Sequence, residues 1–138
     1  DVIHSVDSLR LADRISRDAV KRGKTATVLA QVNPSGEASK GGFDTRTADE
    51  EIHRMAELPG LKVFGLMTMA PFVDDEVVIG NAFAGLRRLR ERLSQSTDRV
   101  GPELSMGMTN DMEIAIREGS TMVRIGTALL GRRVGSAQ

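Results

Sequence analysis

The sequence predicts an α/β fold built on a parallel β-sheet. Short apolar stretches rich in β-branched residues recur along the chain, and amphipathic stretches of helical length separate them. Glycine and proline mark most of the boundaries between these stretches. The chain has 138 residues, so we expect residues 1–138 to form a single domain.

The first predicted strand covers residues 2–6, and a helix follows it. Asp7 or Ser8 can cap the start of this helix, because a side-chain oxygen there can accept a free backbone N–H. The triplet Arg22-Gly23-Lys24 is typical of a helix end. Between these limits the apolar residues fall largely at helical spacing.

The second predicted strand covers residues 25–32, and the turn residues 33–36 end it. A polar loop follows. We expect the second helix to begin after Asp44 or Thr45 and to run to about Leu58.

Pro59-Gly60 separates that helix from a third strand at residues 61–67. The loop 70–76 then leads into a third helix, expected from about residue 78 to residue 93, whose leucines share one face. Gly101-Pro102 predicts the next turn.

Two similar units close the pattern, at residues 104–111 and 122–127. Each reads as a short buried strand that ends in a glycine-bearing turn with a hydroxyl side chain and then leads into a helix, which after the second unit is only a short terminal segment at residues 128–133. In parallel α/β folds such turns lie beyond the carboxyl ends of the strands, where backbone N–H groups can hold a phosphate. With these two units the chain has five predicted strands and four helices.

The candidate site residues belong to these two units. Gly107 and Gly126 let backbone amides approach an anion closely, and the hydroxyls of Ser105 and Thr127 can donate hydrogen bonds to it. Arg124 either forms a salt bridge to a helix or points into the site, because buried arginine is rare without a partner. Met106 fills the core or lines a flat ligand.

Composition narrows the function classes. The chain has 19 basic and 19 acidic residues and only four aromatic residues, which argues against a nucleic-acid or membrane-surface role. It contains no cysteine, and neither of its two histidines has a neighbouring ligand, so no metal site is expected. No apolar run approaches the about 20 residues of a membrane span. We therefore expect a cytoplasmic protein.

At these residues the sequence resembles the YggS/PROSC family of pyridoxal-phosphate-binding homeostasis proteins. The matching segments follow the family's order along almost the whole chain: His4-Ser5-Val6-Asp7-Ser8, Gln31-Val32-Asn33, Gly65-Leu66-Met67, Leu104-Ser105-Met106-Gly107-Met108 and Glu118-Gly119-Ser120-Thr121-Met122-Val123-Arg124-Ile125-Gly126-Thr127.

The resemblance implies the (β/α)8 barrel of the alanine racemase N-terminal domain and a role in vitamin B6 and amino-acid homeostasis. By the resemblance, the cofactor is pyridoxal 5′-phosphate. Its phosphate would be held by Ser105, Gly107, Gly126 and Thr127, with Met106 beside it, and Arg124 would face the pyridine nitrogen.

The family's Schiff-base lysine lies on the first barrel strand, upstream of the part that this chain matches. We therefore expect a truncated, incomplete barrel of about five βα units without the first three, and weak noncovalent cofactor binding or none. Lys40 follows a strand, but the family pattern does not give it the lysine's role. Five strands cannot close the usual barrel, so we expect self-association or a partner chain at the open sheet edges.

Two alternatives stay open. A pyridoxal-phosphate-dependent amino-acid racemase would need the lysine and a second base, often tyrosine, and this chain has no tyrosine. The expectation is therefore a binding protein rather than an enzyme. The other alternative is a barrel fragment that holds a sugar phosphate, a nucleotide or another phosphate anion.

Overall fold

The computed structural model describes residues 1–34 and 41–126, and this part of the chain alternates strands and helices as predicted. In chain order the elements are β1 (Val2–Val6), α1 (Leu9–Lys21), β2 (Ala26–Asn33), β3 (Phe43–Asp44), α2 (Ala48–Ala56), β4 (Leu61–Met67), α3 (Glu76–Ser96), β5 (Val100–Ser105) and α4 (Met112–Arg117).

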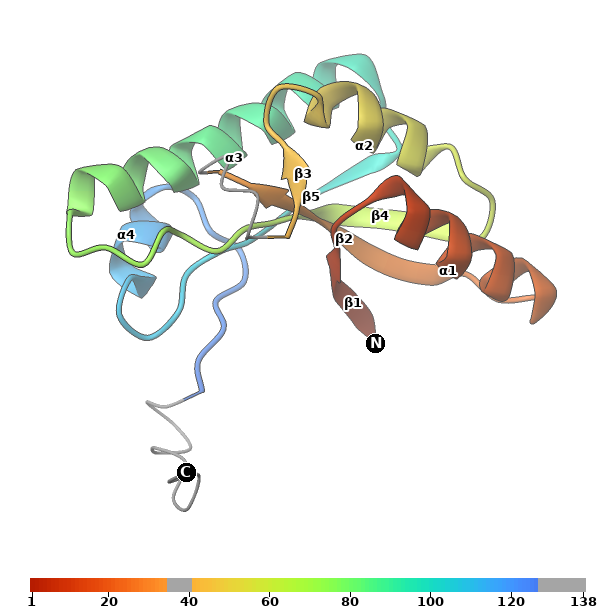
Figure 1. Cartoon of the computed structure of the whole chain (residues 1–138), viewed down its shortest axis with the longest axis horizontal. Helices are drawn as coiled ribbons and strands as arrows, with labels where there is room; N and C mark the ends of the chain where they lie inside the picture. Colours follow the sequence, from red (N-terminus) through yellow and green to blue (C-terminus); the bar gives the residue numbers. More distant parts are fainter. Residues whose placement is uncertain (35–40, 127–138) are drawn as a thin grey trace.

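The described strands form one parallel sheet. Its order is β1-β2-β4-β5, and the two-residue strand β3 pairs with the end of β2 (Figure 1). Each long connection between neighbouring strands contains a helix, as parallel pairing requires. The carboxyl ends of the strands therefore meet at one end of the sheet, where the loops into the next helices also lie.

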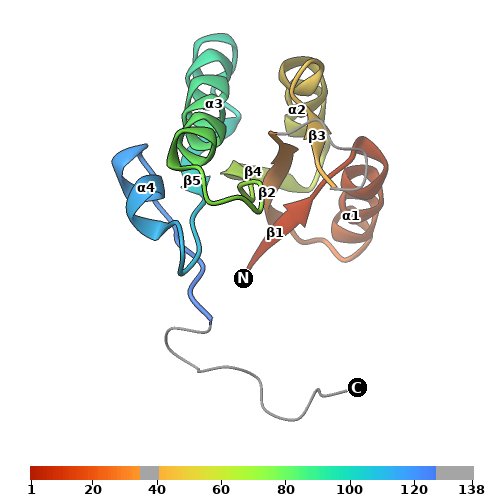
Figure 2. The ribbon, with the colours of Figure 1, turned by 60° about the vertical axis from the view of Figure 1, so that its left-hand side comes forward.

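The helices form an arc outside the strands, and the core lies between the two layers (Figure 2). Val28, Ala30 and Val32 alternate along β2 and are buried against the helices, as the two-residue period of a strand requires. The longest helix, α3, contributes Phe83, Leu86, Leu89 and Leu93 to the same core.

The helix starts follow from capping side chains. Ser8 Oγ accepts a hydrogen bond from Leu11 N at 3.2 Å, which confirms the predicted start of α1. Asp75 caps α3 in the same way, with Oδ1 accepting from Val77 N at 2.9 Å. Because Asp75 fixes this start, α3 begins at Glu76, two residues before the predicted position.

The start predicted for α2 was wrong. The helix was predicted to begin after Asp44 or Thr45, but Phe43–Asp44 pairs with the end of β2 as a short strand and residues 45–47 form a turn. The Asp44 carboxylate accepts from Arg46 N at 2.9 Å and so stabilises a turn, and α2 begins at Ala48.

Two predictions near β5 were also wrong. Gly101-Pro102 lies inside the strand rather than in a turn. Proline is tolerated there because β5 is the last strand in the sheet order, so one of its edges needs few N–H donors. The strand predicted at 122–127 is reduced, within the described residues, to one bridge between Ser105 and Met122.

Candidate functional site

The candidate site lies beyond the carboxyl ends of β4 and β5. There a cleft of about 660 Å³ runs between the loop after β4 and the turn after β5. Three of the predicted residues, Gly107, Arg124 and Gly126, line this cleft. The structure thus brings residues from both glycine-bearing turns to one place.

A hydrogen-bonded contact joins the two turns. Arg124 N donates to Gly107 O at 2.9 Å, and Met106 N donates to Met122 O at 3.1 Å. The segment that carries Arg124 therefore lies along the end of β5 and its turn. Sequence spacing alone does not fix this register.

Gly107 has a backbone conformation that other residues rarely adopt. Its φ is +102°, and a Cβ atom at this position would lie 2.6 Å from Ala115 Cβ. The turn can therefore pack closely against α4 because residue 107 has no side chain. Glycine at this position is therefore required for the packing of the turn against α4.

Arg124 is half-buried and held by the neighbouring strand. Its Nη2 donates to Thr68 O at 2.6 Å, just beyond the end of β4. Its Nε is buried and has no hydrogen-bond partner among the described residues. Burial lowers the pKa of Arg124, and the Asp111 carboxylate acts in the opposite direction. One donor of the guanidinium is thus left without an acceptor among these residues.

Ser105 and Met106 lie differently from the other predicted residues. Both are fully buried and neither lines the cleft. Ser105 Oγ lies 3.3 Å from His4 Nδ1, and Met106 belongs to the hydrophobic core. Thr127, the sixth predicted residue, lies outside the described residues.

Sequence reasoning did not assign a positioning role to several residues that hold the site in place, although it named Thr68 at the end of a strand and Asp111 after the first turn. The carbonyl group of Thr68 fixes Arg124, and Asp111 Oδ1 accepts from Met108 N at 2.6 Å within the turn. The hydroxyls of Ser120 and Thr121 bind the end of β5. The sequence offered one signal for Ser120 and Thr121: they are adjacent hydroxyl residues directly before a predicted strand.

The cleft is lined by both apolar and acidic side chains, the latter being Asp74, Glu76 and Asp111. Met69, Phe72, Val73 and Met108 line it and are exposed, and Phe72 is 98% exposed. Gly107, Gly126 and Arg124 line the same cleft as these apolar side chains.

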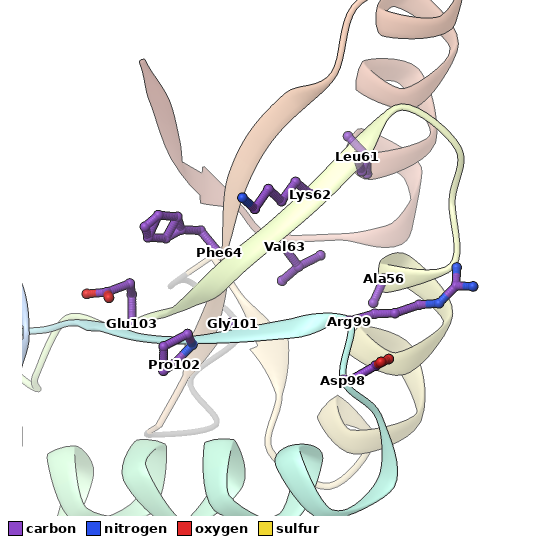
Figure 3. Close-up of a pocket in the computed structure, with 10 residues that line it drawn as sticks. All are labelled: Ala56, Leu61, Lys62, Val63, Phe64, Asp98, Arg99, Gly101, Pro102 and Glu103. Atoms are coloured by element: carbon purple, nitrogen blue, oxygen red, sulfur yellow. The ribbon is translucent and has the colours of Figure 1, made fainter.

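A second hollow of about 510 Å³ lies at the other end of the strands (Figure 3). It is lined by residues around the beginnings of β4 and β5, including Lys62, Phe64 and Glu103. Lys62 Nζ lies 5.9 Å from the centre of the Phe64 ring. Ligand sites of parallel α/β folds lie at the carboxyl ends of the strands, so the first cleft is the better candidate.

Residues 1–34 and 41–126 contain no group of three or more His, Cys, Asp or Glu side chains that could hold a metal ion. None of the helices in the same ranges has the length and apolar character needed to cross a membrane.

The chain is similar to a known protein family and to several curated proteins. The family profile described as "Alanine racemase, N-terminal domain" matches residues 1–134. A curated protein of Aquifex aeolicus (strain VF5) named "Pyridoxal phosphate homeostasis protein" is 43% identical over 132 residues, which cover 96% of this chain and 58% of that protein. The resemblance predicted from the sequence is confirmed.

Solved structures with a similar fold support the same family relationship. An unknown protein from Bifidobacterium adolescentis is 51% identical, with a TM-score of 0.90 over 94% of this chain and 53% of that one. PipY of Synechococcus elongatus PCC7942, solved with PLP bound, is 34% identical, with a TM-score of 0.84 over 95% of this chain and 61% of that one. The chain thus spans little more than half the length of these proteins. Its parallel α/β fold, part of a barrel of the alanine racemase N-terminal type, is the one predicted.

Proposed function

Because the chain belongs to the alanine racemase N-terminal domain family, we propose that it binds pyridoxal 5′-phosphate and serves intracellular vitamin B6 and amino-acid homeostasis. The names of its curated relatives and the PLP bound to PipY support this proposal. The proposed setting is the cytoplasm, in keeping with a sequence that has no cysteine.

One observation carries the proposal: the buried Nε of Arg124 has no partner among the described residues, although the same guanidinium is fixed through Nη2. An unsatisfied buried donor is costly, and a ligand that accepts its hydrogen bond removes the cost. The pyridine nitrogen of the cofactor is such an acceptor. The residues present therefore fit the group.

In this proposal Gly107 and Gly126 hold the phosphate through backbone amides, with Thr127 as the proposed hydroxyl donor. Ser105 and Met106, which are buried and do not line the cleft, support the turn from behind, and Ser105 is not retained as a phosphate donor. When bound, the cofactor supplies an electron-withdrawing ring. Arg124 disfavours protonation of the ring nitrogen and so weakens this property. The arrangement favours binding over catalysis.

We expect binding to be noncovalent. Lys21 ends α1, Lys24 precedes β2 and Lys62 is the second residue of β4, so all three lie at the end of the sheet opposite the cleft. Lys40 lies outside the described residues. No lysine in the described part of the chain is therefore close to the site.

Titration tests the proposal. The chain is titrated with pyridoxal 5′-phosphate, pyridoxal, inorganic phosphate and a sugar phosphate, and binding is followed by absorbance and calorimetry. We expect pyridoxal 5′-phosphate to bind most tightly and Arg124→Gln to weaken it about tenfold or more. The matched control is Arg92→Gln, which removes a guanidinium that binds Asp49 at 3.1 Å on the outer face.

Three results would overturn parts of this proposal. Equal affinity for all phosphate compounds would favour a general phosphate site. Absence of pyridoxal 5′-phosphate binding would contradict the function itself. A cofactor absorbance band that survives dialysis and is fixed by borohydride would contradict noncovalent binding.

We also infer that the chain associates through its sheet edges. Within the described residues β1 pairs with β2 alone, so its other edge offers backbone donors and acceptors to a second strand. A second copy of this chain is the proposed partner.

A further inference from the structure

The segment that carries Arg124 is held by a short set of backbone contacts. In the described residues its strand-like pairing is one bridge, between Ser105 and Met122, and the bonds from Met106 N to Met122 O and from Arg124 N to Gly107 O continue it. A slip of one residue in so short a pairing would turn a side chain to the other face. Side-chain hydrogen bonds that support this pairing therefore bear on the position of Arg124.

Ser120 supplies one such hydrogen bond. Its Oγ lies 2.7 Å from Met106 O, 2.9 Å from Met122 O and 3.3 Å from Leu104 O. A hydroxyl has one proton, so Ser120 donates to one of these carbonyl oxygens at a time, and Met106 O is the nearest. The hydroxyl thus sits between the end of β5 and the segment beside it.

Thr121 occupies the hydrogen-bonding groups of Leu104. Its Oγ1 accepts from Leu104 N at 2.8 Å, and its backbone N donates to Leu104 O at 3.0 Å. Met122 N donates to the same carbonyl at 3.1 Å. Thr121 and Met122 therefore supply hydrogen-bond partners to both backbone groups of Leu104, as a neighbouring strand would.

The start of this segment is also fixed. Arg87 on α3 donates through Nη1 to Glu118 O at 3.0 Å and to Glu118 Oε2 at 2.7 Å. Gly119 then turns the chain away from α4 with φ +96°. Ser120 and Thr121 thus follow an anchored point and precede the site by a few residues.

We propose that Ser120 and Thr121 are positioning residues, whose hydroxyls set the register of Arg124 against Gly107 and so aim the guanidinium into the cleft. The consequence for a ligand rests on the proposed function. The register itself does not, because the Arg124 N to Gly107 O bond and the Arg124 Nη2 to Thr68 O bond can be observed without ligand.

The test uses four variants of the full chain. Ser120→Ala removes the donor, and Thr121→Val removes the hydroxyl with little change of shape. Thr121→Ser restores the hydroxyl and is the rescue. Ser16→Ala is the matched control, because Ser16 Oγ donates to a backbone carbonyl, Pro59 O, far from the cleft.

Two readouts report the position of Arg124. The first is the NMR resonance of its Nε–Hε group, assigned by its loss in Arg124→Lys. The second is hydrogen exchange of the Arg124 amide, compared with global unfolding measured in urea. We expect Ser120→Ala and Thr121→Val to shift the resonance and to speed amide exchange by about five- to tenfold beyond the effect on global stability. Thr121→Ser and Ser16→Ala should leave both readouts unchanged.

Titration with pyridoxal 5′-phosphate is the third readout. Ser120→Ala and Thr121→Val should weaken binding about five- to tenfold, and the rescue and the control should bind as the parent does. If the parent does not bind, the proposed function fails, and the two NMR readouts still decide the positioning role. Unchanged Arg124 signals in both hydroxyl deletions, or equal changes in Ser16→Ala, would overturn it.

Discussion

His4 Nδ1 lies 3.3 Å from Ser105 Oγ, although 101 residues separate the two in sequence. Their strands, β1 and β5, are not neighbours, because β2 and β4 lie between them in the sheet. In a flat sheet three strand spacings would place them about 14 Å apart. The two side chains therefore meet across the inner face of a strongly curved sheet, as in part of a barrel.

The His4–Ser105 contact predicts a measurable coupling. His4→Ala, Ser105→Ala and the double variant form a cycle, and the free energy of unfolding of each is measured in urea. We expect an interaction energy of about 0.5–1 kcal/mol, because the hydrogen bond is partly exposed on the histidine side. Strictly additive effects would show that the two strands do not meet in solution.

The curvature also depends on two glycines on adjacent strands. A Cβ at Gly65 would lie 2.0 Å from Glu103 O, and a Cβ at Gly101 would lie 2.3 Å from Phe64 O. These atoms belong to the backbone and cannot move alone, and the β4–β5 register shifts at this point. The close approach of the two backbones requires glycine on both strands.

Gly65→Ala and Gly101→Ala should each destabilise the chain by about 3 kcal/mol or more, because the strands must separate to admit a methyl group. Urea unfolding measures the loss. Gly85→Ala is the control: Gly85 lies in α3 with nothing within 4 Å of a Cβ, so alanine should stabilise the helix by up to about 1 kcal/mol. Similar stabilities of all three variants would contradict the tight β4–β5 approach.

Most elements could be predicted because local pattern and tertiary structure agree. Ser8 caps α1 at the predicted position, and the alternating strands and helices follow from short apolar stretches. The strand Phe43–Asp44 could not be predicted, because two residues are too few to show the alternation of apolar and polar residues that marks a strand. Only the pairing with β2 defines it. Gly101-Pro102 has turn chemistry, but its place on the last strand of the sheet overrides it.

The site was predictable to a similar degree. Gly107, Arg124 and Gly126 come together as the two glycine-bearing turns suggested. Their mutual register was not predictable, because it involves hydrogen bonds with groups about 15 residues earlier: Ser120 Oγ donates to Met106 O, and Thr121 Oγ1 accepts from Leu104 N. Such contacts leave no periodic trace in a sequence.

Asp44 should titrate at an unusually low pH. Hydrogen bonds from the side chain and backbone of Arg46 hold the pKa of Asp44 at about 2, against an ordinary value of 3.8. The folded-state pKa is the lower one, so the contribution of this turn to stability is present above pH 3.8 and is lost as the pH falls toward about 2. NMR titration of the Asp44 carboxyl group measures the shift. Arg46→Gln should return the pKa toward its ordinary value, and an unchanged low value would contradict the assigned cause.

Edge pairing predicts concentration-dependent association. Ile3 lies on β1, whose outer edge has no pairing strand among the described residues, and its side chain is 41% exposed. Sedimentation velocity over a range of concentrations should detect a dimer or larger species of the parent chain. Ile3→Lys should reduce association, because a charge on an edge strand opposes pairing with a second strand. The control Val77→Lys changes an apolar side chain that is 70% exposed on α3, away from the edge, and should leave association unchanged.

If the parent chain remains monomeric at all concentrations, the edges are not used for self-association. If both lysine variants dissociate the dimer equally, exposed apolar surface rather than edge pairing holds it together.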